Sequence, residues 1–316
     1  MPRVLTGIHH VTALCGDPQR AIDFYAGTLG LRFVKKTVNF DAPQVYHLYF
    51  GDAEGTPGSI ITFFAWPDAA RGRRGAGQLT SIAFAAPHGS LPFWKRRLET
   101  HGIAVVGEEE RFGEMLLRLL DPDGLEIEIV ASDHAAAHPV WPVGPIPTEV
   151  AIRQLSGVTA TLSSVDAAAD FYEAVLGFRE RARDGRRWRF VTGHGGAGAL
   201  LDIVAAPEAP RGRIAVGQIH HVAWRTPSDE EALAWREQLL AAGHAVTPIL
   251  DRQYFRSIYF HEPGGVLFEI ATDLPGFARD EPLEQLGTRL MLPPWLEPYR
   301  AQIEEALPPV QLPVVR

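Results

Sequence analysis

The sequence predicts an α+β protein made of four βαβββ modules, arranged as two tandem halves. The first observation is an internal repeat: residues 23–32 read DFYAGTLGLR, and residues 170–179 read DFYEAVLGFR. The second is a later repeat, in which DPDGLEIEI from Asp121 resembles EPGGVLFEI from Glu262. Repeats of this kind indicate duplicated structural units. Each half divides again, so modules are expected at residues 5–67, 77–133, 152–206 and 216–273.

Each module begins with a short apolar strand and continues with a helix and three more strands. Runs of β-branched and aromatic residues between Gly or Asp turns predict the strands. The first strands are expected at residues 7–14, 79–86, 155–162 and 219–226. The helices are expected at residues 18–30, 91–102, 166–177 and 228–244. Gly30 ends the first helix, as glycine commonly does. The later strands of the fourth module are expected at residues 247–250, 256–260 and 266–272.

The halves define an N-terminal domain at residues 5–133 and a C-terminal domain at residues 152–273. Residues 134–151 between them are rich in Pro and Ala and are expected to form a linker. The tail, residues 274–316, contains the segment LPPWLEPYRAQIEEALPPV. Its middle is expected to be a short helix, because prolines bound it on both sides.

Composition and charge exclude several classes of protein. Of the 316 residues, 46% are apolar and 22% are charged, which is typical of globular proteins and argues against disorder or a coiled coil. Cys15 is the only cysteine, which excludes a disulfide framework and a Cys-rich zinc site. The net charge of −8 argues against a nucleic-acid partner.

The chain shows no signal for a membrane. No run approaches the ~18 apolar residues of a membrane span, so no membrane partner is expected. The segment MPRVLTGIHH lacks the apolar core of a signal peptide, and the expected compartment is the cytoplasm. The sequence leaves the oligomeric state open, and a homo-oligomer is compatible with it.

Residues that only some modules retain are candidates for function, because residues required for folding should be present in all four modules. In the first strands, the first module has His9-His10 and the fourth has His220-His221. The second module has Thr80-Ser81 there, and the third has Ser156-Gly157. Neighbouring residues of a strand point to opposite faces, so one His of each pair is expected to face a common cavity.

The last strands add a carboxylate to the two histidines. Glu269 lies in the apolar run VLFEIA of the fourth module, and a buried carboxylate is costly without a partner or a metal. Two His and one Glu match the set that binds Fe(II) in non-haem oxygenases and leaves positions open for substrate and O₂. Glu128, in LEIEIVA of the second module, is interpreted either as the remnant of a second site or as an outward-facing glutamate.

With these residues in place, the sequence resembles the vicinal oxygen chelate superfamily, which includes glyoxalases, extradiol dioxygenases and bleomycin-resistance proteins. It is most similar to ring-cleaving dioxygenases that act on hydroquinones, such as the 2,6-dichlorohydroquinone 1,2-dioxygenases. In that branch the His pairs lie in the first and fourth modules, as they do here. The motifs behind the resemblance are GIHHVTA (7–13), VYHLYFGDAEGTPGS (45–59), GQIHHVAW (217–224), DRQYFRSIYFHEPGGVLFEIATDLPGF (251–277) and LPPWLEP (292–298).

The resemblance implies a vicinal oxygen chelate fold, in which mixed sheets form open barrels, and it implies roles for eight residues. The metal ligands would be His10, His221 and Glu269. The other His of each pair would lie close to the metal, and three further residues match active-site positions of the branch. These five implied catalytic residues are His9, Thr12, His220, Arg252 and Tyr259.

Two of these residues have a simpler interpretation. Arg252 has a counterpart in Arg111 of the second module, so the alternative interpretation of Arg252 is a residue that forms a structural ion pair. Tyr259 replaces Arg118 of that module, and its alternative is a core aromatic residue.

The implied reaction is extradiol-type ring cleavage of a small aromatic substrate, with Fe(II) as cofactor and O₂ as cosubstrate. Mn(II) is an alternative metal, because carboxylate and imidazole bind both ions. His220 and Tyr259 are the candidates for moving a proton.

Two other functions compete with ring cleavage. By resemblance, a glyoxalase-like isomerase or lyase would have a site with two glutamates that binds Ni or Zn. Only one carboxylate accompanies the two His here, which counts against this function. A metal-free module that binds an aromatic or glycopeptide ligand is disfavoured by the complete His–His–Glu set.

Overall fold

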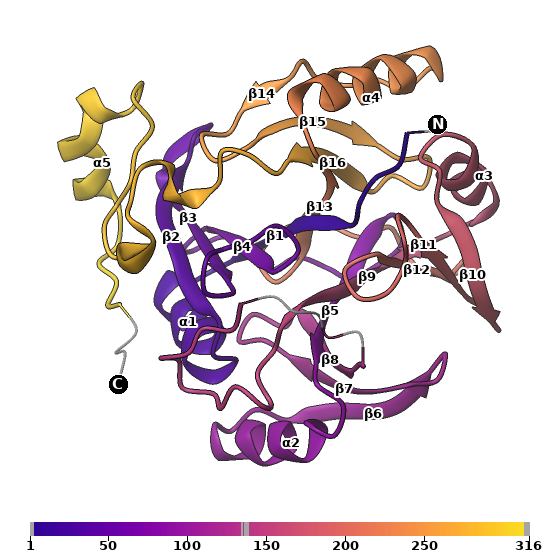
Figure 1. Cartoon of the computed structure of the whole chain (residues 1–316), viewed down its shortest axis with the longest axis horizontal. Helices are drawn as coiled ribbons and strands as arrows, with labels where there is room; N and C mark the ends of the chain where they lie inside the picture. Colours follow the sequence, from indigo (N-terminus) through magenta and orange to yellow (C-terminus); the bar gives the residue numbers. More distant parts are fainter. Residues whose placement is uncertain (1–2, 134, 136–138, 313–316) are drawn as a thin grey trace.

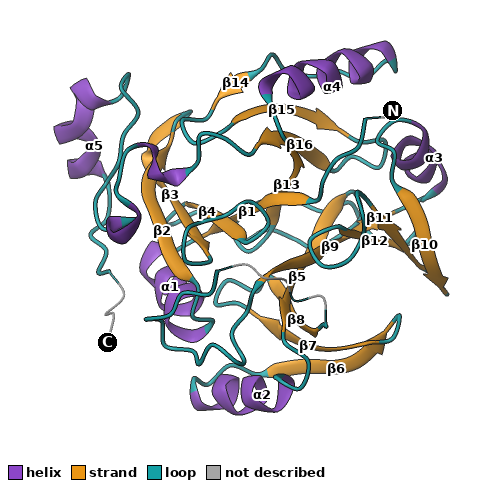
Figure 2. Ribbon diagram, viewed as in Figure 1, coloured by secondary structure: helices purple, strands orange, loops and turns teal. Residues whose placement is uncertain are grey.

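The computed structural model describes residues 3–133, 135 and 139–312. Its architecture is two eight-stranded mixed sheets with helices at the periphery (Figure 2). The first sheet has the order β14-β15-β16-β13-β1-β4-β3-β2. Its strands are β1 (Ile8–Cys15), β2 (Arg32–Asn39), β3 (Ala42–Gly51), β4 (Ile60–Ala65), β13 (Ile219–Thr226), β14 (Leu250–Asp251), β15 (Arg256–His261) and β16 (Leu267–Thr272).

The second sheet has the order β10-β11-β12-β9-β5-β8-β7-β6. Its strands are β5 (Gln78–Ala86), β6 (Val105–Arg111), β7 (Glu114–Leu120), β8 (Glu126–Ala131), β9 (Gln154–Leu162), β10 (Arg179–Asp184), β11 (Arg187–Val191) and β12 (Leu200–Ala205). In both sheets the two first strands of the paired modules run antiparallel at the centre, and each is flanked by a parallel last strand.

Each sheet therefore draws on both halves of the chain. The first and fourth modules build one sheet, and the second and third build the other. The predicted fold class is confirmed, whereas the domain boundaries at 5–133 and 152–273 stay a prediction about the sequence repeat. Residues 134 and 136–138 of the predicted linker and residues 313–316 of the tail lie outside the described residues.

The helices lie on the outside of the two sheets (Figure 1). Helix α4 illustrates why they form: the Ser228 side chain accepts a hydrogen bond from the Glu231 backbone N–H, and three acidic residues occupy its first turn. The first predicted helix is α-helical only over Pro18–Ile22 and continues as π-helical turns over Asp23–Thr28. The α-helices are α1 (Pro18–Ile22), α2 (Leu91–Thr100), α3 (Asp166–Ala174), α4 (Asp229–Ala241) and, in the tail, α5 (Arg300–Ala306).

One predicted strand is much shorter than expected. The segment 247–250 contributes only its last residue to β14, which consists of two residues. Pro248 has no backbone N–H to donate to a neighbouring strand, so the ladder is interrupted there.

Two buried hydrogen bonds tie the sheets together. The Tyr25 hydroxyl, at the end of the first helix, donates to Asp121 Oδ2 in the turn before β8 at 3.0 Å. The equivalent Tyr172 hydroxyl donates to Glu262 Oε2 before β16, also at 3.0 Å. Each bond joins two modules of the same half, and these modules belong to different sheets. Among the described residues, no helix is both long and apolar enough to cross a membrane.

Candidate active site

The floor of the candidate site forms where β1 and β13 pair at the centre of the first sheet. The register pairs Thr12 with His221 and His10 with Ala223, so the two histidines lie diagonally across the strand pair. Strand β16 runs parallel to β13 and places Glu269 beside Ala223. Three strands that are distant in sequence thus bring His10, His221 and Glu269 together.

The ligand-type atoms of these three residues converge. The Nε2 atoms of His10 and His221 lie 3.4 and 2.9 Å from Oε2 of Glu269. All three residues are at most 3% exposed. Within the described part of the chain, His221 Nε2 and both carboxylate oxygens of Glu269 have no hydrogen bond of acceptable geometry. Buried polar atoms without partners are costly, so a divalent cation at this meeting point fits the donor set.

The charge states also suit a cation. Burial raises the pKa of Glu269, but the neighbouring His10 and His221 lower it further, so the net pKa lies well below its ordinary value. Burial lowers the pKa of His221. An ionised carboxylate and a neutral imidazole are the forms that bind divalent metals.

His9 and His220 do not alternate away from their neighbours as expected for regular strands. The register between β1 and β13 shifts at both residues, so each is the extra residue of a β-bulge, which re-aims a side chain. Their Nδ1 atoms lie 2.9 and 2.7 Å from the Nδ1 atoms of His10 and His221. His9 is buried and packs against Phe255, with ring centroids 5.0 Å apart. His220 lines the cavity together with His221, so the expectation of one cavity-facing His per pair is wrong there.

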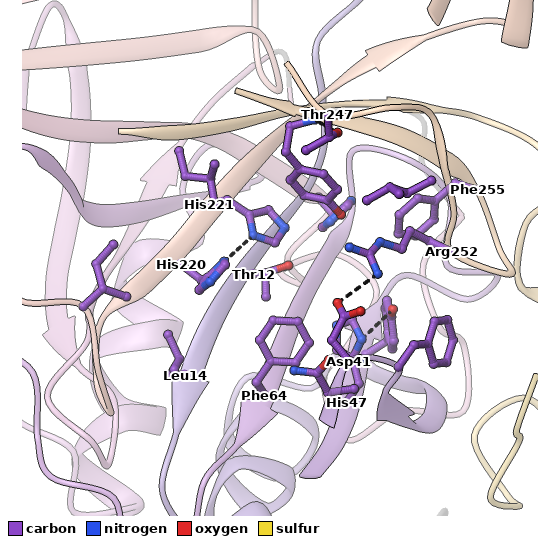
Figure 3. A pocket seen from close by; sticks show the side chains of 18 of the residues that line it. Thr12, Leu14, Asp41, His47, Phe64, His220, His221, Thr247, Arg252 and Phe255 are labelled. Carbon is purple, nitrogen blue, oxygen red and sulfur yellow. Dashed lines mark hydrogen bonds and ion pairs between the residues drawn. The ribbon is translucent and has the colours of Figure 1, made fainter. Parts of the chain in front are cut away.

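His10 and His221 line a cavity of about 680 Å³, in which Figure 3 labels His221 together with His220, Thr12 and Arg252. Thr12, Arg252 and Tyr259 all line it, so the core-aromatic alternative for Tyr259 is wrong. Arg252 forms an ion pair with the exposed Asp41 at 3.2 Å, and its guanidinium lies 5.2 Å from the centroid of the Tyr259 ring. Arg252 therefore makes an ion pair and faces the cavity at once. Much of the remaining lining is apolar: Leu14, Phe40, Phe64, Trp66, Ile214, Leu250, Phe255 and Leu267.

His47 lines the same cavity and is absent from the residues that the sequence indicates. Its Nε2 lies 2.8 Å from Thr62 Oγ1, and its Nδ1 lies 2.9 Å from the Tyr49 hydroxyl. The signal that indicates His47 lies in the third strands of the modules, whereas His10, His221 and Glu269 lie in the first and last strands. By register, the position of His47 is held by Leu116, Arg187 and Ser257 in the other modules.

Ion pairs fill the equivalent place in the second sheet. By register, Glu128 and Asp202 are the equivalents of Glu269. Arg111 donates to both carboxylate oxygens of Glu128, at 2.7 and 3.1 Å, and Arg189 donates to Asp202 at 2.8 and 3.1 Å. Glu128 is 1% exposed, so the outward-facing alternative is wrong. The space left between these groups is about 10 Å³, and guanidinium groups bind the two carboxylates at this equivalent position.

The fold and the His–His–Glu site agree with the comparisons to known proteins. The chain belongs to the Glyoxalase/Bleomycin resistance protein/Dioxygenase superfamily, whose family model matches residues 7–129 and 154–270. It is 44% identical over 312 residues to "Putative ring-cleaving dioxygenase MhqO" of Bacillus subtilis (strain 168), covering 99% of each chain. It is 36% identical over 311 residues to "Chlorohydroquinone/hydroquinone 1,2-dioxygenase" of Sphingobium indicum, covering 96% of each.

Solved structures show the same relationship. A Bacillus subtilis protein described as a "putative dioxygenase" has a TM-score of 0.94 and 43% identity, covering 99% of both chains. Glyoxalase I from Zea mays shares the fold with a TM-score of 0.63 at 16% identity, covering 84% of this chain and 92% of that one. The superfamily predicted from the sequence is confirmed.

Proposed function

We propose that this protein is a metal-dependent dioxygenase that opens the ring of a hydroquinone-type aromatic compound with O₂. The observation that carries the proposal is the buried set of His10, His221 and Glu269 beneath a cavity with a largely apolar lining. Two imidazoles and one carboxylate leave positions on a cation open for substrate and O₂. The Sphingobium indicum relative, a chlorohydroquinone/hydroquinone 1,2-dioxygenase, supports the substrate class.

The proposed metal is Fe(II), and Mn(II) suits the same donors. His10 and His221 would bind it through Nε2, and Glu269 through its carboxylate. When bound, iron supplies adjacent positions for substrate and O₂ and a path for electrons from the ring to oxygen. An imidazole that offers Nε2 carries its proton on Nδ1. The Nδ1 atoms of His9 and His220 are placed to accept that hydrogen bond, which supports an orienting role for both.

The remaining residues would orient the substrate. The hydroxyls of a hydroquinone are para to each other, so only one reaches the metal and the protein must hold the other. Burial raises the pKa of Tyr259, which keeps its hydroxyl protonated as a donor, and Arg252 beside it carries a positive charge. We propose that Tyr259 and Arg252 bind the substrate hydroxyl that does not reach the metal. His220, whose pKa burial lowers to about 3, is neutral and would present its Nε2–H to an oxygen in the cavity.

A specific observation favours the dioxygenase over a glyoxalase-like isomerase. The isomerase would need a second carboxylate, and the register puts Thr62 at the position in the first module that corresponds to Glu269 in the fourth. A metal-free binding module is disfavoured by the three buried atoms that lack partners.

The test is anaerobic reconstitution with Fe(II), followed by O₂ uptake on matched hydroquinones and catechols. We expect iron to bind and hydroquinones to be cleaved faster than catechols. Zinc or nickel in the purified protein without O₂ uptake on any ring substrate would support the isomerase instead. The cytoplasmic location stays a prediction.

A further inference from the structure

Four buried or partly buried side chains on the inner face of β1, β3 and β4 form a continuous chain of hydrogen bonds. Tyr49 Oη lies 2.9 Å from Nδ1 of His47, whose Nε2 lies 2.8 Å from Thr62 Oγ1. Thr62 Oγ1 donates to Thr12 Oγ1 at 2.9 Å. Strand register explains the contact, because Thr12 and Tyr49 both pair with Thr62 and the side chains share one face. The chain ends at Thr12, beside the three candidate metal ligands.

The direction of every hydrogen bond in this chain follows from the bond that Thr62 donates to Thr12. A hydroxyl has one hydrogen, and Thr62 gives its hydrogen to Thr12, so Thr62 must accept from the Nε2–H of His47. A neutral imidazole with Nε2–H has a bare Nδ1, which accepts from the Tyr49 hydroxyl. His47 is neutral, because burial lowers its pKa well below its ordinary value and nearby His10 lowers it further.

The consequence appears at Thr12, where the chain of hydrogen bonds ends. The oxygen of Thr12 already accepts a hydrogen bond, and the hydrogen of Thr12 is left to donate into the cavity that Thr12 lines. Aligned hydrogen bonds polarise one another, which makes the last hydroxyl a stronger donor. Burial also raises the pKa of Tyr49 well above its ordinary value, so the far end of the chain does not release a proton. The chain holds a donor in place and does not deliver protons.

The chain is specific to the first module. Thr62 and Tyr49 occupy the positions that Glu269 and Tyr259 occupy in the fourth module, and Thr12 corresponds to Ala223. The side of the cavity that lacks a second carboxylate therefore carries a neutral hydrogen-bond donor. A neutral donor at this place leaves room for an anionic oxygen, which a carboxylate would repel.

We infer that His47 and Thr62 are positioning residues that hold the Thr12 hydroxyl as a donor to an anionic oxygen of the bound substrate, such as a phenolate. The substrate class rests on the proposed function, whereas the direction of the hydrogen bonds follows from the geometry of the chain together with the neutral state of His47. In this role His47 and Thr62 act through Thr12 and are not metal ligands.

The test uses 4-nitrophenolate, a coloured phenolate that offers no second hydroxyl for ring cleavage, with nitrobenzene as its uncharged counterpart. Both are titrated anaerobically into the Fe(II)-loaded protein at one pH, for wild type, Thr62→Val, Thr62→Ser and Thr161→Val. Thr161 is the matched control, because its hydroxyl contacts that of Thr80 at 2.9 Å in the second sheet and lies outside the cavity lining. Thermal unfolding of each variant checks its fold.

We expect Thr62→Val to weaken 4-nitrophenolate binding about fivefold, as for the loss of roughly one hydrogen bond of ~1 kcal/mol. Nitrobenzene binding should stay unchanged, and Thr62→Ser and Thr161→Val should bind both probes like the wild type. Equal binding of 4-nitrophenolate by wild type and Thr62→Val overturns the inference. If Thr62→Val loses both probes, Thr62→Ser decides: wild-type binding supports the inference, and weak binding by a folded Ser variant overturns it. Binding that depends on Thr62 without any hydroquinone cleavage would reject the proposed function and retain the inference.

Discussion

At the scale of single residues, Glu269 and Glu128 show how one position acquires two different chemistries. Both glutamates are buried at equivalent places in their sheets. Glu269 faces two imidazoles and leaves its oxygens without hydrogen bonds, whereas Glu128 is held by the guanidinium of Arg111. The carboxylate at this position is therefore available to a cation in the first sheet, where it belongs to Glu269, and is neutralised by an arginine in the second sheet, where it belongs to Glu128.

This difference gives the first prediction. Glu269→Gln should remove most of the bound metal, because a neutral amide replaces the only anionic ligand proposed for the site. Glu128→Gln is the matched control and should keep the metal, while losing up to about 3–5 kcal/mol of stability because Arg111 loses a buried partner. Metal per chain is measured by elemental analysis, and unfolding by denaturant titration. Full metal content in the Glu269 variant would contradict the ligand assignment.

The second prediction concerns Tyr259. Tyr259→Phe keeps the ring against Arg252 and removes a hydroxyl proposed to bind a charged substrate oxygen, a contact worth ~1.5–3 kcal/mol. If the contact strengthens in the transition state, the rate of O₂ uptake with hydroquinone should fall about 10- to 100-fold. Tyr172→Phe, which loses a buried hydrogen bond to Glu262, should lower stability and leave the rate unchanged. An unchanged rate for Tyr259→Phe would remove Tyr259 from the proposed mechanism.

At the scale of secondary-structure elements, the two β-bulges at the centre of the first sheet matter most. Regular alternation in a strand would send His9 and His220 to the face opposite their neighbours. The bulges bring each of them within hydrogen-bond distance of the adjacent histidine. A bulge depends on the register between two strands, so it follows from the pairing of β1 with β13 and not from either strand alone.

The contact between the first helix and the turn before β8 gives the third prediction. Burial raises the pKa of Asp121 to about 6 from an ordinary 3.8, so the folded state favours the protonated acid. Its contribution to stability is present below about pH 4 and is lost as the pH rises through about 6. The shift corresponds to about 3 kcal/mol at 1.36 kcal/mol per pKa unit.

Asp121→Asn tests this contribution, because the amide stays neutral at every pH and still reaches the Tyr25 hydroxyl. The free energy of unfolding of the variant relative to wild type should rise by up to about 3 kcal/mol between pH 4 and pH 7. Denaturant unfolding at a series of pH values measures the difference. A constant difference over this range would show that Asp121 does not titrate near pH 6.

At the scale of the whole molecule, two copies of one loop form a backbone contact between the halves, in addition to the strand pairing within the two sheets. The repeated segments RGRRGAGQ and RGRIAVGQ lie side by side, and Arg73 and Arg213 exchange two backbone hydrogen bonds of 3.0 and 2.8 Å. Backbone approaches backbone so closely that a Cβ added at Gly75 would lie 2.2 Å from the carbonyl oxygen of Pro210. Glycine is needed there because no side chain fits.

The fourth prediction follows from this crossing. Gly75→Ala should lower the free energy of unfolding by about 1–3 kcal/mol, the usual cost of overpacking. Gly27→Ala is the matched control, because a Cβ at this exposed residue meets no atom within 4 Å, and its stability should stay close to that of the wild type. Chemical denaturation of the two variants measures both effects. Equal stability of the Gly75 variant and the wild type would mean that the two segments separate at little cost.

The sequence by itself determined the modules and the principal ligand candidates. Strand and helix periodicity is local, so the four first strands and the helices that follow them could be located without knowing their partners. The His pairs at 9–10 and 220–221 occur in only two of the four duplicated modules, which selected them as candidates together with the buried Glu269. The choice of His10 and His221 within these pairs came from the family resemblance.

Tertiary structure decided how the modules combine and what surrounds the ligand candidates. Pairing of the first module with the fourth depends on hydrogen bonds and packing between segments about 210 residues apart, as between β1 and β13, which no local pattern encodes. The same pairing creates the bulges at His9 and His220 and brings His47 into line with Thr62 and Thr12. The arginines that neutralise Glu128 and Asp202 likewise come from neighbouring strands, because a buried carboxylate takes its partner from whatever the fold brings within hydrogen-bond distance.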